Sequence, residues 1–378
     1  MEDAPASDAA APRRVHKLTT WRQFLDAGPA WDQLAARDPD GVLLSHDWAA
    51  QCWKCSAEIR AGEEPLVLVV WGKGQRPLAI LPLRRNRRTR RICFLDEVRA
   101  QRLDLLAQPE HAPEAWASAL TELHRSGGWD RFDLQSLRPE SAEAVQAACL
   151  GLRLAVRERG RVRQRRLDLD RPWRAIETGF SPYLRANFRR RLRRLEARGI
   201  VRLDTLQTPD HLQPGLNACF ALEKQGWKGA GATAIMDAPL QGRFYRQLAY
   251  RLAAGGALRL FCLWLDRELI AFEYCVFDRG SHRLSSLKIA YNEAFRTASP
   301  GTVLRWLLLR ETLGQFSSYE FLGDDAPWKA EWTPAYIELR HLRIYNRTVG
   351  GYAWRARSRA YATWLNLRSG LSRGVQQR

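Results

Sequence analysis

The sequence predicts an α/β protein of two domains with mixed, mainly antiparallel sheets. Its 378 residues divide into two or three units of roughly 150 residues. Apolar runs of strand length alternate with helical patterns, which is typical of an α/β fold. Two hairpin patterns also repeat each other at an offset of roughly 190 residues, LVLVVWGKGQRPLAILPL from Leu66 and LRLFCLWLDRELIAFEYC from Leu258. This weak repeat suggests a duplicated domain.

The first half opens with a helix and a hairpin. Ser45 is placed to cap a helix that runs through two tryptophans toward Arg60. A hairpin follows, with strands at 66–71 and 78–83 around the turn Gly72-Lys73-Gly74.

Two further helices of the first half are marked at both ends. Pro113 and Pro139 stand in their first turns, where proline is favoured. Gly127 and Gly151 end them, and a strand is expected at 132–137 between them.

A strongly basic helix separates the halves. Ser181 is its expected N-cap, Pro182 its first residue and Gly199 its stop. One face carries an apolar stripe of Leu184, Phe188, Leu192 and Leu195. The other face carries Arg185, Arg189, Arg190, Arg191, Arg193, Arg194 and Arg198. A solvated surface and a polyanion-binding surface both fit this pattern, and basic runs at 84–91 and 157–165 add to the charge.

The second half shows the α/β pattern more clearly. Strands are expected at 259–265, 269–277 and 284–291, followed by a helix that opens at Ser299. The elements divide the chain into a disordered tail at 1–14, an N-terminal domain at 15–170, a C-terminal domain at 171–345 and a basic, aromatic tail at 346–378.

The composition indicates a globular protein with anionic partners. Apolar residues make up 46% of the chain and aromatic residues 10%, which is enough for two cores. Sixty Lys and Arg against 41 Asp and Glu give a net charge of +19. Nucleic acid, phosphorylated cofactors, acidic carriers and anionic lipid all fit this charge. Since only seven of the sixty are Lys, a GC-rich genome explains part of the Arg excess.

The sequence favours a cytoplasmic location. It has no uncharged apolar run of membrane-spanning length, and its acidic N-terminus does not look like a secretory signal. Seven scattered cysteines suit a reducing compartment. Cys52 and Cys55 lie near His46, but a zinc site needs a fourth ligand, so we expect buried thiols and no metal.

A helix start is the main candidate for a binding site. No hydrolase elbow, Walker loop, zincin motif or dinucleotide fingerprint occurs in the sequence. Instead, a helix opens directly after a strand, with Ser299 as its expected N-cap, Pro300 and Gly301 in its first turn and Arg296 nearby. Free backbone N–H groups and partial positive charge at such a terminus can bind a pyrophosphate or another anion. An ordinary helix start fits the same tripeptide.

Several motifs in order resemble one family. LEKQGWKGAGATA from Leu222, LKIAYNEAFRTASPG from Leu287 and FLGDDAPWKAEW from Phe321 are similar to the GNAT-fold acyltransferases of the CelD type, or cellulose-biosynthesis type, which look related to the Fem peptidyltransferases. The resemblance covers roughly residues 175 to 345. It implies tandem GNAT-like domains, of which the N-terminal one is degenerate and the C-terminal one carries the site.

The resemblance also implies a set of site residues. Glu223, Tyr291 and Glu293 are the catalytic candidates, with a glutamate as base and Tyr291 as acid. The substrate-binding candidates are Trp227, Lys228, Lys288, Asp325 and Lys329. Arg296, Ser299 and Gly301 would bind the donor. A surface salt bridge is the alternative for each acid, and a turn is the alternative for Asp325.

The expected activity is transfer of an acyl group to an amine acceptor, with no permanently bound cofactor. Only Arg296 and Gly301 keep the spacing of the acetyl-CoA loop of the wider superfamily, so acyl-CoA, an acyl carrier protein and aminoacyl-tRNA all stay open as donors. A noncatalytic polyanion-binding or nucleic-acid-binding protein is the alternative from another class. The tail from Tyr352 to Leu371 docks on the fold or lies on an anionic membrane surface.

Overall fold

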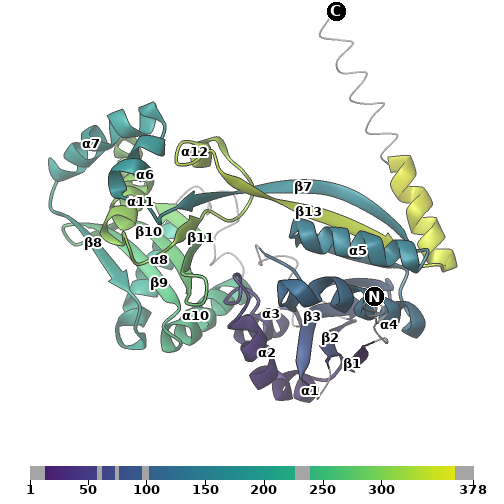
Figure 1. Ribbon diagram of the computed structural model, residues 1–378. Coiled ribbons are helices and arrows are strands. Elements are labelled where there is room, and N and C mark those ends of the chain that lie inside the picture. Colours follow the sequence, from purple (N-terminus) through teal and green to yellow (C-terminus); the bar gives the residue numbers. More distant parts are fainter. Residues whose placement is uncertain (1–12, 58–61, 73–75, 96–101, 226–238, 362–378) are drawn as a thin grey trace, which may run out of the picture.

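The computed structural model describes residues 13–57, 62–72, 76–95, 102–225 and 239–361. Two lobes are joined by two long neighbouring strands, β7 (Ala155–Asp168) and β13 (Tyr336–Tyr345) (Figure 1). The strands form one continuous mixed sheet in the order β1-β2-β3-β4-β6-β13-β7-β12-β11-β10-β9-β8. The two sheets expected from the sequence are therefore joined.

The first lobe contains the helices and strands that its sequence signals predict, together with several elements that no sequence signal predicted. In chain order they are β1 (Arg14–Leu18), α1 (Trp21–Asp26), α2 (Gly28–Ala35), α3 (His46–Ala57), β2 (Glu63–Trp71), β3 (Pro77–Asn86), β4 (Arg91–Phe94), β5 (Leu106–Ala107), η2 (Pro109–His111), α4 (Ala112–Ser126), β6 (Arg131–Leu137) and α5 (Pro139–Gly151). The Ser45 hydroxyl accepts the Trp48 N–H at 3.3 Å, which confirms the expected cap. Gly127 ends α4 with a positive φ of 63°, a conformation that glycine tolerates best.

The second lobe also follows the expected order. Its elements are α6 (Trp173–Gly179), α7 (Pro182–Glu196), β8 (Val201–Leu206), η3 (Pro209–His211), α8 (Leu212–Gln225), α10 (Pro239–Ala254), β9 (Leu258–Leu265), β10 (Glu268–Asp278), β11 (Arg283–Tyr291), η5 (Glu293–Ala298), α11 (Pro300–Glu311), β12 (Ser318–Glu320) and α12 (Pro327–Ala330). The three strands predicted between residues 259 and 291 are confirmed with small changes in their bounds.

The two lobes repeat one topology, which agrees with the duplication suggested by the hairpins. In the first lobe β1, β2, β3 and β4 pair antiparallel in turn, and β4 pairs parallel with β6. In the second, β8, β9, β10 and β11 pair antiparallel in turn, and β11 pairs parallel with β12.

The last strand of each repeat is exchanged. The strand β7, which ends the first repeat, pairs with β12 of the second, and β13 pairs with β6 of the first. The strands β7 and β13 also pair antiparallel with each other, so the exchange joins the two halves into one sheet.

Helices cover both faces of the second half-sheet. One hydrophobic cluster joins α8, α10 and one face of β9 and β10 to helices α2 and α3 of the first lobe. A second cluster joins α7 and α11 to the opposite face. A third cluster forms the separate core of the first lobe beneath α4 and α5. Residues on the two faces of β10 therefore lie in different environments.

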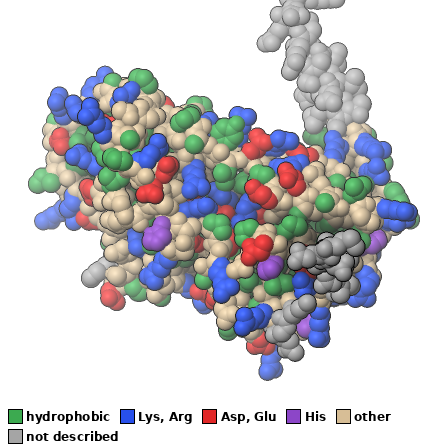
Figure 2. Space-filling model, viewed as in Figure 1, with side chains coloured by type: hydrophobic (Ala, Val, Ile, Leu, Met, Phe, Trp, Pro, Cys, Tyr) green, Lys and Arg blue, Asp and Glu red, His purple; other side chains and the backbone are tan. Residues whose placement is uncertain are grey.

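The basic helix α7 forms as the sequence predicts. The Ser181 hydroxyl accepts the Leu184 N–H at 3.1 Å. Leu184 and Leu195 are buried, and Phe188 stacks on Trp306 of α11 with ring centroids 4.1 Å apart. The opposite face leaves its arginines at the surface, where they contribute to the Lys and Arg side chains that gather over this lobe (Figure 2).

The three basic runs of the sequence have different surroundings. Arg84 is buried against Glu63, with Nη1 and Oε2 2.6 Å apart. Arg161 and Arg165 of β7 pair with Glu338 and Asp325 at 2.7 and 2.8 Å. Within the described residues, no carboxylate lies within salt-bridge distance of the α7 arginines.

The two tails are described only in part. Residues 1–12 and 362–378 lie outside the described residues. Residues 349–361 are helical and pack on the first lobe, where Arg131 lies 4.0 Å from the Trp354 ring centroid. Within the described residues, no helix has both the length and the apolar character needed to cross a membrane. Cys52 and Cys55 are buried, and neither forms a disulfide with another cysteine of the described residues.

Candidate functional site

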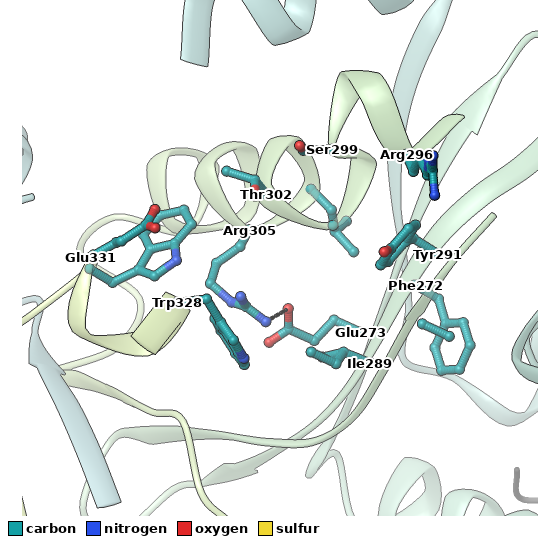
Figure 3. Close-up of a pocket in the computed structure, with 14 residues that line it drawn as sticks. Phe272, Glu273, Ile289, Tyr291, Arg296, Ser299, Thr302, Arg305, Trp328 and Glu331 are labelled. Carbon is teal, nitrogen blue, oxygen red and sulfur yellow. Dashed lines mark hydrogen bonds and ion pairs between the residues drawn. The ribbon is translucent and has the colours of Figure 1, made fainter. Parts of the chain in front are cut away.

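A cavity opens where β11 leaves β12. The two strands pair only from Arg283 to Ser285 of β11, and β12 ends at Glu320 while β11 continues to Tyr291. The cavity has a volume of about 370 Å³ and lies between this part of β11 and α11 (Figure 3). Its walls are Phe272, Glu273, Ile289, Ala290, Tyr291, Arg296, Ser299, Gly301, Thr302, Leu304, Arg305, Trp328, Glu331 and Trp332.

The N-terminus of α11 forms one wall of this cavity. Ser299 stands at the N-cap position but adopts a left-handed conformation (φ 48°, ψ 61°), and its side chain makes no capping hydrogen bond. The expectation that its hydroxyl caps the helix is therefore wrong. The turn at Ser299 instead leads the chain directly from η5 into α11. Gly301 lies in the first turn. Pro300 has no N–H, and the Thr302 and Val303 N–H groups donate to the Ser299 carbonyl at 2.9 and 3.2 Å. In the described part of the chain, the Gly301 N–H is therefore the one N–H of this turn without a backbone acceptor.

Four predicted residues meet at this cavity. Tyr291, Arg296, Ser299 and Gly301 all line it, because they follow one another along the end of β11, η5 and the start of α11. Figure 3 shows Tyr291 and Arg296 together at one end of the cavity.

The Tyr291 hydroxyl is held in its protonated form. Burial raises its pKa, and the neighbouring Glu293 carboxylate, which accepts a hydrogen bond from the hydroxyl, raises it further. Arg296 opposes this effect. Glu293 does not line the cavity itself. It affects the site because it interacts with Tyr291, which does.

A buried ionic network lies deeper in the same cavity. Arg305 of α11 donates from Nη2 to Glu273 of β10 and from Nε to the Tyr319 hydroxyl, each at 2.9 Å. The Tyr319 hydroxyl also donates to Glu273. Burial disfavours the charge on Arg305, but Glu273 outweighs it, so the pKa of Arg305 is raised. Burial likewise raises the pKa of Tyr319.

Sequence reasoning missed this network. Its signal was present, since Glu273 and Arg305 are charged residues inside strongly apolar stretches, AFEYCVF and VLRWLLL. Buried charges are rare unless they are paired, so each predicts a partner. The sequence did not show that the two are partners.

A second cavity of about 190 Å³ lies on the other side of Ile289 and Trp328, which line both cavities. Lys288 and Lys329 belong to its wall. The Lys329 ammonium donates to the carbonyl oxygens of Leu322 and Asp324, the latter at 2.6 Å. Burial, with a smaller effect of Arg305, lowers the pKa of Lys329 to about 8.

The other predicted residues lie apart from the two cavities. Glu223 is fully buried on α8 and lines neither cavity. Asp325 pairs with Arg165 of β7, whose hydrogen bond lowers the pKa of this carboxyl. Trp227 and Lys228 lie outside the described residues. Within the part of the chain that the structure describes, no group of three His, Cys, Asp or Glu side chains is arranged to hold a metal ion.

Helix α11 and the parting of β11 and β12 fall within the segment that a known family matches. Residues 183–330 match the acetyltransferase (GNAT) domain. The chain therefore has a GNAT-like mixed α/β fold, and most residues that line the larger cavity lie within the matched segment. No match to the sequence is found among the curated proteins.

Solved structures of low sequence identity share this fold. FemX aligns with a TM-score of 0.58 and 11% identity, over 86% of this chain and 96% of FemX. The C-terminal domain described as that of a lysylphosphatidylglycerol synthetase from Agrobacterium fabrum aligns with a TM-score of 0.55 and 11% identity, over 88% and 95%. A conserved protein of unknown function from Bacteroides thetaiotaomicron aligns with a TM-score of 0.52 and 10% identity, over 88% and 100%.

Proposed function

We propose that this protein is an N-acyltransferase that moves an acyl group from acyl-CoA or an acyl carrier protein to an amine. One observation carries the proposal: the GNAT domain has two cavities that share the walls Ile289 and Trp328 where β11 separates from β12. Donor and acceptor need neighbouring sites that open onto the same reacting atoms. We also propose that this protein is related to the CelD-type enzymes of polysaccharide biosynthesis.

The larger cavity is the proposed donor site. The N-terminus of α11 offers the Gly301 N–H and partial positive charge to the donor phosphates, and Arg296 adds a full charge beside it. The smaller cavity, with Lys288 in its wall, is the proposed acceptor site.

In the proposed step the neutral amine attacks the thioester carbonyl. The C–N bond forms and the C–S bond breaks. The amine releases one proton to solvent, and the leaving thiolate takes one from the Tyr291 hydroxyl, which solvent then reprotonates. A backbone N–H of β11 beyond Ser285, where β12 no longer pairs, is the candidate oxyanion donor. Tyr291 turns its hydroxyl from Glu293 to the leaving sulfur, and its raised pKa keeps the proton in place until then.

A second candidate is an aminoacyl-tRNA-dependent transferase, in which the ester oxygen replaces the thioester sulfur. The arginine face of α7 favours it, because it has no carboxylate partners among the described residues and because α7 contacts η5, which carries Arg296. Arg194 donates to the Thr297 carbonyl at 2.9 Å, next to Arg296 and Ser299. A polyphosphate backbone could follow this surface to the cavity mouth.

The test offers acetyl-CoA, acyl carrier protein and charged tRNA in parallel and measures binding and transfer to a panel of amines. Binding of one donor, with release of its carrier in the presence of an amine, is the expected result. If tRNA binds in its charged and uncharged forms alike and no donor reacts, the protein is the polyanion-binding alternative instead.

A further inference from the structure

One buried cation of the larger cavity has no role in the transfer step described above. Arg305 is only 4% exposed, yet it lines the cavity. Its side chain extends from α11 toward the cavity between Trp328 and Glu273 (Figure 3). A charged side chain so placed either serves the fold alone or binds a ligand.

The hydrogen bonds of Arg305 use only one edge of its guanidinium group. The edge formed by Nε and Nη2 donates to Tyr319 and Glu273. The end formed by Nη1 and the second Nη2 hydrogen donates to no residue of the described part of the chain. Because Arg305 lines the cavity, these N–H groups are placed to donate to a ligand there.

Aromatic rings hold this free end in position. The guanidinium carbon lies 4.7 Å from the Trp328 ring centroid, 5.5 Å from that of Phe321 and 5.7 Å from that of Trp332. Each contact is within the range of a cation–π interaction. The donors are therefore oriented before a ligand arrives, and binding loses little side-chain entropy.

At the end of the cavity that contains Glu273 and Arg305, the surrounding charges favour a ligand group with one negative charge rather than two. Its walls contain two cations, Arg296 and Arg305, and two carboxylates, Glu273 and Glu331. The α11 N-terminus adds partial positive charge, and Lys329 lies close enough to interact electrostatically with Arg305. Near Glu273 a dianionic phosphate would meet more repulsion than a carboxylate. Two parallel N–H donors also match the two oxygens of a carboxylate.

We infer that Arg305 binds a carboxylate of the ligand that occupies this cavity. The inference rests on the proposed function, which gives that ligand its role. The ligand is either the donor, with a carboxylate on its acyl group, or an amino acid that serves as acceptor. The shared chemistry is a planar monoanion on an otherwise apolar group, in keeping with the aromatic and aliphatic walls.

Calorimetric titration with matched pairs distinguishes the two sources. Succinyl-CoA against butyryl-CoA compares acyl groups of equal length, and phenylalanine against its amide compares acceptors. We expect the carboxylate of one pair to bind about 10- to 100-fold more tightly than its neutral partner. The pair that shows the difference identifies the source.

Variants separate a binding role from a structural one. Arg305→Gln combined with Glu273→Gln removes both charges, so no unpaired charge is left buried, and it should abolish the preference. Glu273→Gln alone removes the competitor for Arg305 and should strengthen carboxylate binding. The matched control combines Arg84→Gln with Glu63→Gln at the buried pair of the first lobe and should leave the preference unchanged.

Two results would overturn the inference: neither pair shows a preference, or the preference survives in the folded double variant at Arg305 and Glu273. The proposed function fails separately, through absence of acyl transfer while the Arg305-dependent preference remains. Circular dichroism of each variant checks that it is folded.

Discussion

Replacement of Gly301 by glutamate tests the proposed donor site directly. Gly301 lies in the first turn of α11 and lines the cavity. A Cβ atom at this position would lie 3.7 Å from Cδ1 of Tyr291, which is ordinary van der Waals contact. Alanine therefore fits without strain, whereas glutamate adds a flexible carboxylate at the mouth of the cavity.

The expected loss of affinity follows from charge. A carboxylate about 6 Å from a donor phosphate, at an effective dielectric constant of about 20, costs roughly 3 kcal/mol for each phosphate charge. This corresponds to at least about 100-fold weaker donor binding. Gly301→Ala changes no charge, so its donor affinity should stay within about threefold. Its free energy of unfolding should rise by at most about 1 kcal/mol, because alanine favours the helix.

Titration calorimetry measures the donor affinity of both variants at low salt and at about 0.5 M salt, roughly three times the physiological ionic strength. High salt should recover part of the affinity of Gly301→Glu, because salt screens charges near the surface. An unchanged donor affinity in folded Gly301→Glu would refute the placement of the phosphates. A loss of equal size in Gly301→Ala would show that shape, not charge, controls this terminus.

Three further predictions concern other groups. Tyr291→Phe should lower kcat by about 10²- to 10⁴-fold with donor affinity kept, and full activity in steady-state kinetics would exclude Tyr291 as the acid. The Lys329 pKa of about 8, against 10.5 in the unfolded chain, makes the free energy of unfolding rise with pH between those values, by at most about 3 kcal/mol. Urea titrations should show this rise in the parent protein and not in Lys329→Met. Burial lowers the pKa of His341, whose Nδ1 accepts the Ser136 N–H at 2.9 Å, so stability should fall as pH drops below about 6.5. His341→Gln should lack that fall in thermal melts.

Local signals predicted most elements because short-range physics decides them. Ser181 and Pro182 begin α7, and Ser45 caps α3, as their residue types favour. At Ser299 the local signal predicts the helix start but not the side-chain hydrogen bond. The position of Ser299 before Pro300 marks the helix start correctly, but its left-handed backbone turns the hydroxyl away from the capping position. The conformation depends on how η5 approaches α11, which no local pattern encodes.

Long-range geometry decides which residues share the site. Tyr291 and Gly301 meet because only the short helix η5 and one residue on either side of it separate β11 from α11. Glu223 matches the same motif set, but on α8 it is fully buried and lines neither cavity. The bond from Arg305 to Glu273 spans 32 residues, and that from Tyr319 to Glu273 spans 46. The sequence shows each charged residue but does not show which residue it pairs with in the fold.

The strand exchange gives the first lobe a part in the site. Because β7 pairs with β12, a strand of the first repeat lies beside the loop that leads to α12. Arg165 of β7 donates to Asp325 and to the Pro334 carbonyl, each at 2.8 Å, and so holds both ends of the segment that carries Trp328 and Lys329. Trp328 in turn forms a wall of both cavities and covers Arg305. The first repeat thus positions the second repeat's cavity through its exchanged strand, which is a physical reason for the two repeats to stay in one chain.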